Sequence, residues 1–104
     1  MPMRVYETMI ILDPDLEDSG VRDEVERVKT LLEERGGRVR DVDFWGKRDL
    51  AYEIRHKKEG HYVVLVADAE PAAIDEMSRV LKLNDRVFRH KALRLPDAVA
   101  QPLS

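Results

Sequence analysis

The stretch HYVVLVADA, residues 61–69, is apolar at both of its alternating sets of positions. Successive side chains of a strand point to opposite faces, so a strand with one solvated face shows apolar residues at every second position only. We therefore predict a strand in the middle of a sheet. The stretch MRVYETMIIL, residues 3–12, is apolar on both sides in the same way and ends at Asp13-Pro14, a turn signal. It is predicted to be the second central strand.

Two further strands are predicted outside this central pair. Residues 38–55 return to a period of two, with an interruption at Gly46 that indicates a bulge or bend. The apolar positions expected to pack in the second half of this segment are Leu50, Tyr52 and Ile54. Residues 87–95 also alternate, but only one of their faces is suited to burial. This last segment is therefore predicted to lie beside a central strand.

Two segments show the periodicity of amphipathic helices. The first ends at Gly36-Gly37, which readily adopt the left-handed conformation that ends a helix. Its apolar residues at helical spacing are Val21, Val25, Val28, Leu31 and Leu32. The second begins at Pro71 and is expected to stop near Asn84-Asp85, residues that tolerate the left-handed conformation. Its apolar stripe is predicted to be Ile74, Met77, Val80 and Leu81.

The order of these elements is β-α-β-β-α-β in a chain of 104 residues. It predicts an α+β, ferredoxin-like fold: a four-stranded antiparallel sheet in the spatial order 4-1-3-2, with both helices on one face. Residues 1–95 are expected to form one domain. Residues 96–104 contain two prolines and no pattern, so they are predicted to be a tail. The uncovered face of the sheet is left for solvent or a partner.

The net charge of -3 is distributed unevenly along the chain. Residues 13–34 hold nine acidic residues against three basic ones, whereas residues 79–94 hold six basic residues against one acidic. Residues 47–58 hold five basic residues against two acidic. A local basic surface matters more to a polyanion than the net charge does, although a run of charges can also be a merely solvated face.

Little in the sequence suggests catalysis. The chain has no cysteine, which excludes thiolate nucleophiles, disulfides and sulfur-ligated zinc. Its three histidines lack the spacing of metal ligands, and no glycine-rich loop precedes a helix. We expect no enzyme activity, cofactor, metal ion or small-molecule substrate, with an acylphosphatase-like enzyme as a distant alternative. The apolar run at residues 9–12 is too short for a signal peptide or membrane span.

Nucleic-acid binding is better supported. RNA-recognition motifs have this order of elements and stack bases on aromatic residues of their central strands. Here the corresponding strand has His61 and Val63, so phosphate contact is predicted in place of base stacking. The basic residues predicted to contact phosphate are Lys47, Arg48, Arg55, Lys57, Lys58, Arg86, Arg89, Lys91 and Arg94. Tyr6, Trp45, Tyr52 and Tyr62 are expected to pack within the fold more than to stack on bases.

Three stretches, in the right order, resemble the bacterial small-subunit ribosomal protein S6 family. GKRDLAYEIR (residues 46–55) is similar to the family signature of a glycine, a basic pair, Leu-Ala-Tyr, Ile and a basic residue. RVYETMIILDPDL (residues 4–16) resembles the family's opening strand and proline turn. LKLNDRVFRHKALR (residues 81–94) resembles its helix end, Asn-Asp turn and basic last strand. Together they span nearly the whole chain.

The resemblance implies a structural protein of the small ribosomal subunit, located on the ribosome in the cytoplasm. It also implies joint binding, with ribosomal protein S18, to the central domain of the small-subunit rRNA. By this resemblance Lys47, Arg48 and Arg55 lie at basic positions of the signature, and Arg4, in the opening stretch, joins the rRNA-binding candidates. Candidates for contact with the protein partner are Trp45, Pro96, Val99, Pro102 and Leu103. The alternative is a non-ribosomal ferredoxin-like module that is regulatory or forms homodimers through its open sheet.

Overall fold

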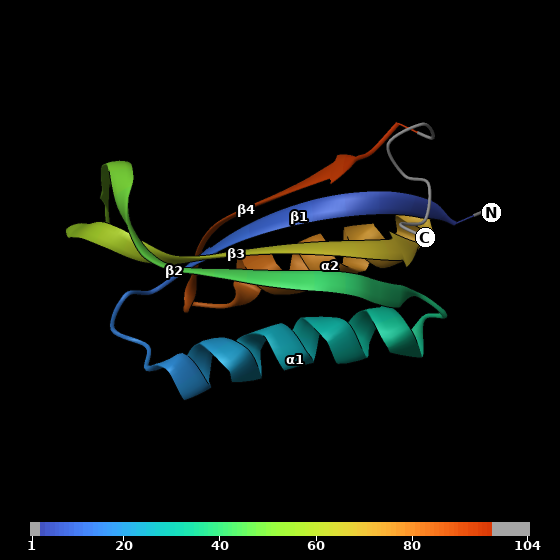
Figure 1. The fold of residues 1–104 in the computed structure, drawn as a ribbon, viewed down its shortest axis with the longest axis horizontal. Helices are drawn as coiled ribbons and strands as arrows, with labels where there is room; N and C mark the ends of the chain where they lie inside the picture. Colours follow the sequence, from blue (N-terminus) through green and yellow to red (C-terminus); the bar gives the residue numbers. More distant parts are fainter. Residues whose placement is uncertain (1–2, 97–104) are drawn as a thin grey trace.

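A computed structural model of the protein describes residues 3–96 as a four-stranded sheet with two helices on one face (Figure 1). The elements are β1 (Arg4–Leu12), α1 (Asp18–Glu34), β2 (Arg38–Ile54), β3 (Lys57–Ala69), α2 (Pro71–Leu83) and β4 (Val87–Arg94). The strands lie in the order β2-β3-β1-β4, and each neighbouring pair is antiparallel. This is the predicted order, and the ferredoxin-like α+β fold is confirmed.

The two-sided apolar strands are the central ones. On the helix-facing side of the sheet, Ile10 of β1 and Val63 of β3 pair with each other and are fully buried. On the opposite side, which we call the open face, Met9 pairs with Val64 and both are only partly buried. Because both faces of β1 and β3 are at least partly shielded, apolar residues suit both sets of positions.

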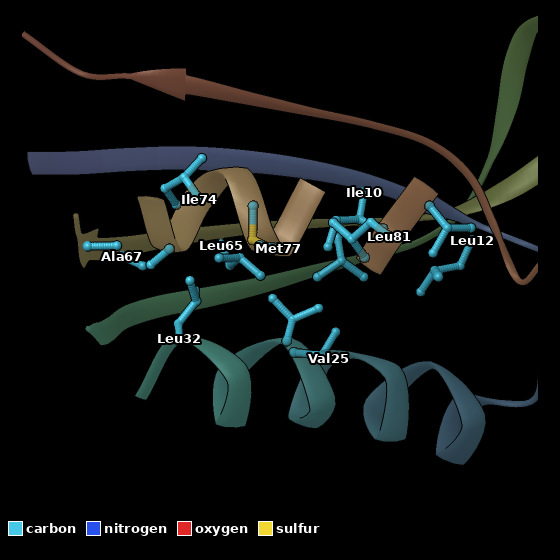
Figure 2. Close-up of a cluster of buried hydrophobic side chains, with 14 of the residues drawn as sticks. Ile10, Leu12, Val25, Leu32, Leu65, Ala67, Ile74, Met77 and Leu81 are labelled. Carbon is cyan, nitrogen blue, oxygen red and sulfur yellow. The ribbon is translucent and has the colours of Figure 1, made fainter. Parts of the chain in front are cut away.

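The core lies between the sheet and the two helices (Figure 2). Val25 and Leu32 of α1 and Met77 and Leu81 of α2 point toward the helix-facing side of the sheet, which carries Ile10, Leu65 and Ala67. Val80, which was expected in the apolar stripe of α2, is not part of the core and is 38% exposed. Ala73 is buried in its place. The buried face of α2 is centred on residues 73, 74, 77 and 81, and position 80 lies at its margin.

The two helices end in different ways. After α1, Gly36 has a φ of 82° and its N–H donates to the carbonyl of Glu33, while Gly37 N–H donates to the carbonyl of Leu32 at 2.8 Å. This is the Schellman arrangement, as the glycine pair predicted. The predicted end of α2 at Asn84 is also confirmed. Asn84 has a φ of -88° and a ψ of 117°, which is extended backbone, so the prediction of a left-handed conformation there is wrong.

Thr8 is a polar residue inside this core. Its side chain, on the helix-facing side of β1, has no exposed surface, and Oγ1 has no hydrogen-bond partner within the described residues. A buried hydroxyl without a hydrogen bond costs about 1–3 kcal/mol. Thr8→Val keeps the shape and removes this cost, so we expect the free energy of unfolding to rise by about 1 kcal/mol in urea denaturation.

The control for this prediction is Thr30→Val, at an exposed position of α1. It is expected to change the free energy of unfolding by less than about 0.5 kcal/mol. A decrease in stability for Thr8→Val would show that the hydroxyl is hydrogen-bonded in solution.

Candidate nucleic-acid interface

The β2–β3 hairpin extends beyond the rest of the sheet (Figure 1). The pairing of β1 with β3 ends at Leu12 and His61, whereas β2 and β3 continue to pair as far as Ile54 and Lys57. The outer part of the hairpin therefore has no β1 neighbour. It holds four of the predicted phosphate-binding residues, namely Arg48, Arg55, Lys57 and Lys58, and Lys47 lies at its base, paired with His61.

A bulge marks the base of this extension. The register shifts immediately before Gly46, which has a φ of 80°, so the interruption predicted there is confirmed. Trp45, beside it, stacks on Tyr62 with ring centroids 6.2 Å apart and an interplanar angle of 6°. The Arg48 guanidinium lies 5.5 Å from the centroid of Trp45, and Trp45 Nε1 donates to Asp43 at 2.9 Å. The bulge thus builds a layered Arg–Trp–Tyr cluster at the border of the open face.

The tip of the hairpin contacts the turns at the same end of the molecule. The Nη1 of Arg55 donates to the carbonyl of Asp85 at 2.6 Å, and the Nζ of Lys57 lies 2.9 Å from Oδ2 of Asp15. The hydrogen bond and charge of Lys57 lower the pKa of Asp15, and Asp15 raises the pKa of Lys57 in return. Arg86 lies 3.7 Å from Asp13. At this end of the molecule, Arg55, Lys57 and Arg86 therefore already hold protein partners.

Basic residues of β4 lie on the open face, at the edge of the sheet opposite the Arg–Trp–Tyr cluster. Arg89 pairs with Ile11, which pairs with Tyr62, which pairs in turn with Gly46. Three strand spacings separate the ends of this row, or roughly 14 Å. Arg48 and Arg89 therefore share the open face, on either side of an apolar middle. Lys91 follows Arg89 on that face, whereas Lys47 points to the other side because strand side chains alternate.

The remaining candidates lie elsewhere. Arg94 pairs with Tyr6 at the far end of the sheet, and Arg4 is on the same end, where it donates to the carbonyl of Met3. Neither is brought near the hairpin. Among the candidates for the protein partner, Trp45 and Pro96 are exposed. Val99, Pro102 and Leu103 lie outside the described residues.

The three histidines do not come together. His61 is buried and its Nε2 lies 2.9 Å from the carbonyl oxygen of Leu16, while His56 is exposed in the hairpin turn. His90 lies on β4, opposite Ile10. Within residues 3–96, no group of three His, Asp or Glu side chains is placed to hold a metal ion. The same part of the chain contains no helix long and apolar enough to cross a membrane.

His90 makes stability depend on pH. Burial, and next the charge of Lys82, lower the pKa of His90 from its ordinary 6.5. As the pH falls below about 6.5, the unfolded chain takes up a proton that the folded protein resists, so stability is lost. Between pH 7.5 and a pH below 6, we expect the free energy of unfolding, measured by urea denaturation, to fall less for His90→Gln than for the parent protein. Thr30→Val, at an exposed position without a titratable group, should retain the parent's pH dependence. Equal pH dependence in all three proteins would contradict this role of His90.

Comparisons with known proteins agree with this architecture. A family profile described as "Ribosomal protein S6" matches residues 5–94. The "Small ribosomal subunit protein bS6" of Streptomyces griseus is 49% identical over 92 residues, which cover 88% of this chain and 96% of the relative. That of Desulforamulus reducens is 48% identical over 92 residues, covering 88% and 97%. The crystal structure of 30S ribosomal protein S6 from Thermotoga maritima superposes with a TM-score of 0.85 at 31% identity, covering 93% of this chain and 92% of that one.

The fold, the basic hairpin and these similarities define a structural protein of the small ribosomal subunit, a class without enzymatic activity. Its location is the ribosome, in the cytoplasm. The chain belongs to the ribosomal protein S6 family. The resemblance found in the sequence is thus confirmed, and neither the acylphosphatase-like enzyme nor the non-ribosomal module is supported.

Proposed function

We propose that this protein binds the central domain of the small-subunit rRNA jointly with ribosomal protein S18. The observation that carries the proposal is the open face of the sheet, where basic residues of the hairpin and of β4 flank an apolar middle. One face thereby offers both phosphate ligands and an apolar surface for a protein partner.

The apolar middle of the open face supports a protein partner. Its residues, all partly exposed, are Met9, Ile11, Tyr62, Val64 and Val66. A contiguous apolar strip of this kind on a soluble protein marks an interaction surface. Trp45, 40% exposed at the border of the strip, is proposed to contact the same partner. The tail from Pro96 onward is proposed to grip it as well.

Exposed basic residues support contact with phosphate. Within residues 3–96, Lys47 and Lys58 of the hairpin and Lys91 and Arg94 of β4 make no ion pair, so their charges are available to a polyanion. Arg48 and Arg89 hydrogen-bond only to backbone carbonyls. The partly exposed Arg4 and the ion-paired Lys57 and Arg86 complete the proposed set. Arg55 is left out of it, because its guanidinium already lies against Phe88 and donates to the carbonyl of Asp85.

The charge balance supports joint binding. A net charge of -3 and the acidic outer surface of α1 oppose RNA, so the lone protein is poorly steered to it. A basic partner on the open face would join the hairpin and β4 into one positive surface. RNA affinity is then expected to depend on the partner and to fall steeply with salt.

The test is a titration of this protein onto a central-domain rRNA fragment, with and without S18, at roughly 50 and 200 mM salt. S18 alone is the control. We expect salt-sensitive binding that needs both proteins. Tight binding by this protein alone would contradict the joint mechanism, and no gain over S18 alone would contradict RNA binding by this chain.

A further inference from the structure

The outer end of the β2–β3 hairpin is poorly held by its own strands. Regular pairing ends at Asp49 and Glu59, and the next pair is Ile54 with Lys57. Residues 50–53 of β2 therefore face Lys58 alone on β3. A two-stranded segment without a complete ladder opens locally more easily than the rest of a sheet.

The turn at the tip is strained as well. Arg55 and His56, between the paired Ile54 and Lys57, have φ angles of 52° and 64°. Two-residue hairpin loops with positive φ at both positions favour Asn-Gly, because residues with a larger side chain pay a steric penalty there. Such a conformation persists only when the surrounding structure holds it.

The contacts that hold it come from the body of the protein. The Arg55 guanidinium carbon lies 5.2 Å from the centroid of the Phe88 ring, and Nη1 donates to the carbonyl of Asp85 at 2.6 Å. Phe88 is only 4% exposed, so the guanidinium stacks on a ring fixed in the fold. Lys57 and Asp15 form an ion pair to the turn between β1 and α1. The tip is thus fastened to two turns.

We propose that Arg55 is a positioning residue whose contacts with Phe88 and Asp85, here called the clasp, fix the hairpin and do not bind RNA phosphate. The clasp sets the direction in which Lys47, Arg48 and Lys58 are presented. A phosphate would have to displace the carbonyl of Asp85 and pull the guanidinium off the Phe88 ring to take over Arg55. The RNA part of this inference rests on the proposed function, whereas the clasp itself does not.

Amide hydrogen exchange on the full chain tests the clasp without RNA. Arg55→Gln should raise exchange rates within residues 50–59 about 10-fold and leave the middle of β1 unchanged. Arg55→Lys keeps the charge but lacks the planar group that stacks on Phe88, so it should open the hairpin similarly. Lys58→Gln, on the same hairpin without an ion pair in residues 3–96, is the control. Unchanged hairpin exchange in Arg55→Gln would overturn the clasp.

The salt dependence of joint RNA binding separates positioning from phosphate contact. A lost phosphate contact lowers the slope of log affinity against log salt by about 0.7–0.9. Arg55→Gln should weaken binding several-fold with the slope unchanged, and Arg55→Lys should not rescue it. A lower slope in Arg55→Gln, with rescue by Arg55→Lys, would make Arg55 an RNA ligand and overturn the positioning role. If no RNA binds even with S18, the proposed function fails and hydrogen exchange still decides the clasp.

Discussion

Leu65→Ala lowers the free energy of unfolding by about 3 kcal/mol, the largest loss of stability we expect from a single truncation in this chain. Leu65 is 1% exposed on the helix-facing side of β3, where it pairs with Thr8 of β1 and Val42 of β2. Because β3 is held by strands on both sides, the backbone cannot move to fill the cavity left by the lost methyl groups. Urea denaturation measures the effect as a lower midpoint with an unchanged slope.

Leu83→Ala is the matched control for this truncation. Leu83 is 70% exposed at the end of α2, so the same chemical change removes little buried surface. Its effect should stay within about 0.5 kcal/mol. Equal losses for the two variants would mean that the core is not centred on β3, and that the sheet order is wrong.

The central position of β1 and β3 was predictable because it depends on a local property. Both strands are apolar on two faces, and only the two inner strands of a four-stranded sheet are shielded on both edges and, in part, on both faces. The bulge at Gly46 was predictable for a similar reason, because a glycine in a strand pattern marks a break in pairing.

Tyr52 shows where the alternating pattern failed. It was expected to pack with Leu50 and Ile54, yet Tyr52 is 63% exposed while Ile54 is buried and Leu50 is partly so. The pairing of β2 with β3 is interrupted between Asp49 and Ile54. Extra residues in one strand change which side each following residue faces, and the strand's own sequence does not record its partner's register.

The roles of the basic residues depend on contacts far away in the sequence. Arg55 and Lys47 both lie in the signature-like stretch, but Arg55 bonds to a carbonyl 30 residues further along the chain and Lys47 makes no ion pair within the described part. The stack of Trp45 on Tyr62 likewise joins two strands. Sequence could nominate these residues, and only the tertiary structure separates a residue with a protein partner from one with a free charge.

Lys47→Glu combined with Arg48→Glu is expected to weaken joint rRNA binding at low salt by a factor of about 100 or more. Each reversal removes a charge-assisted hydrogen bond worth about 1.5–3 kcal/mol and adds repulsion, and 1.4 kcal/mol is a tenfold change. Both side chains are exposed at the base of the hairpin, so the fold should tolerate the change. The measurement is a titration of the rRNA fragment, with S18 present, over a range of salt concentrations.

Arg27→Glu combined with Arg79→Glu is the matched control, because it changes the net charge equally at exposed positions of α1 and α2. This control should weaken binding far less, because salt screening limits the range over which an exposed charge acts on the RNA to about one Debye length. If the two double variants were equally weak, only the net charge would matter and the hairpin would have no special role. Loss of two phosphate contacts should also lower the salt slope by about 1.4–1.8 for the hairpin variant. A weakened affinity with an unchanged slope would instead mean that Lys47 and Arg48 hold the partner protein.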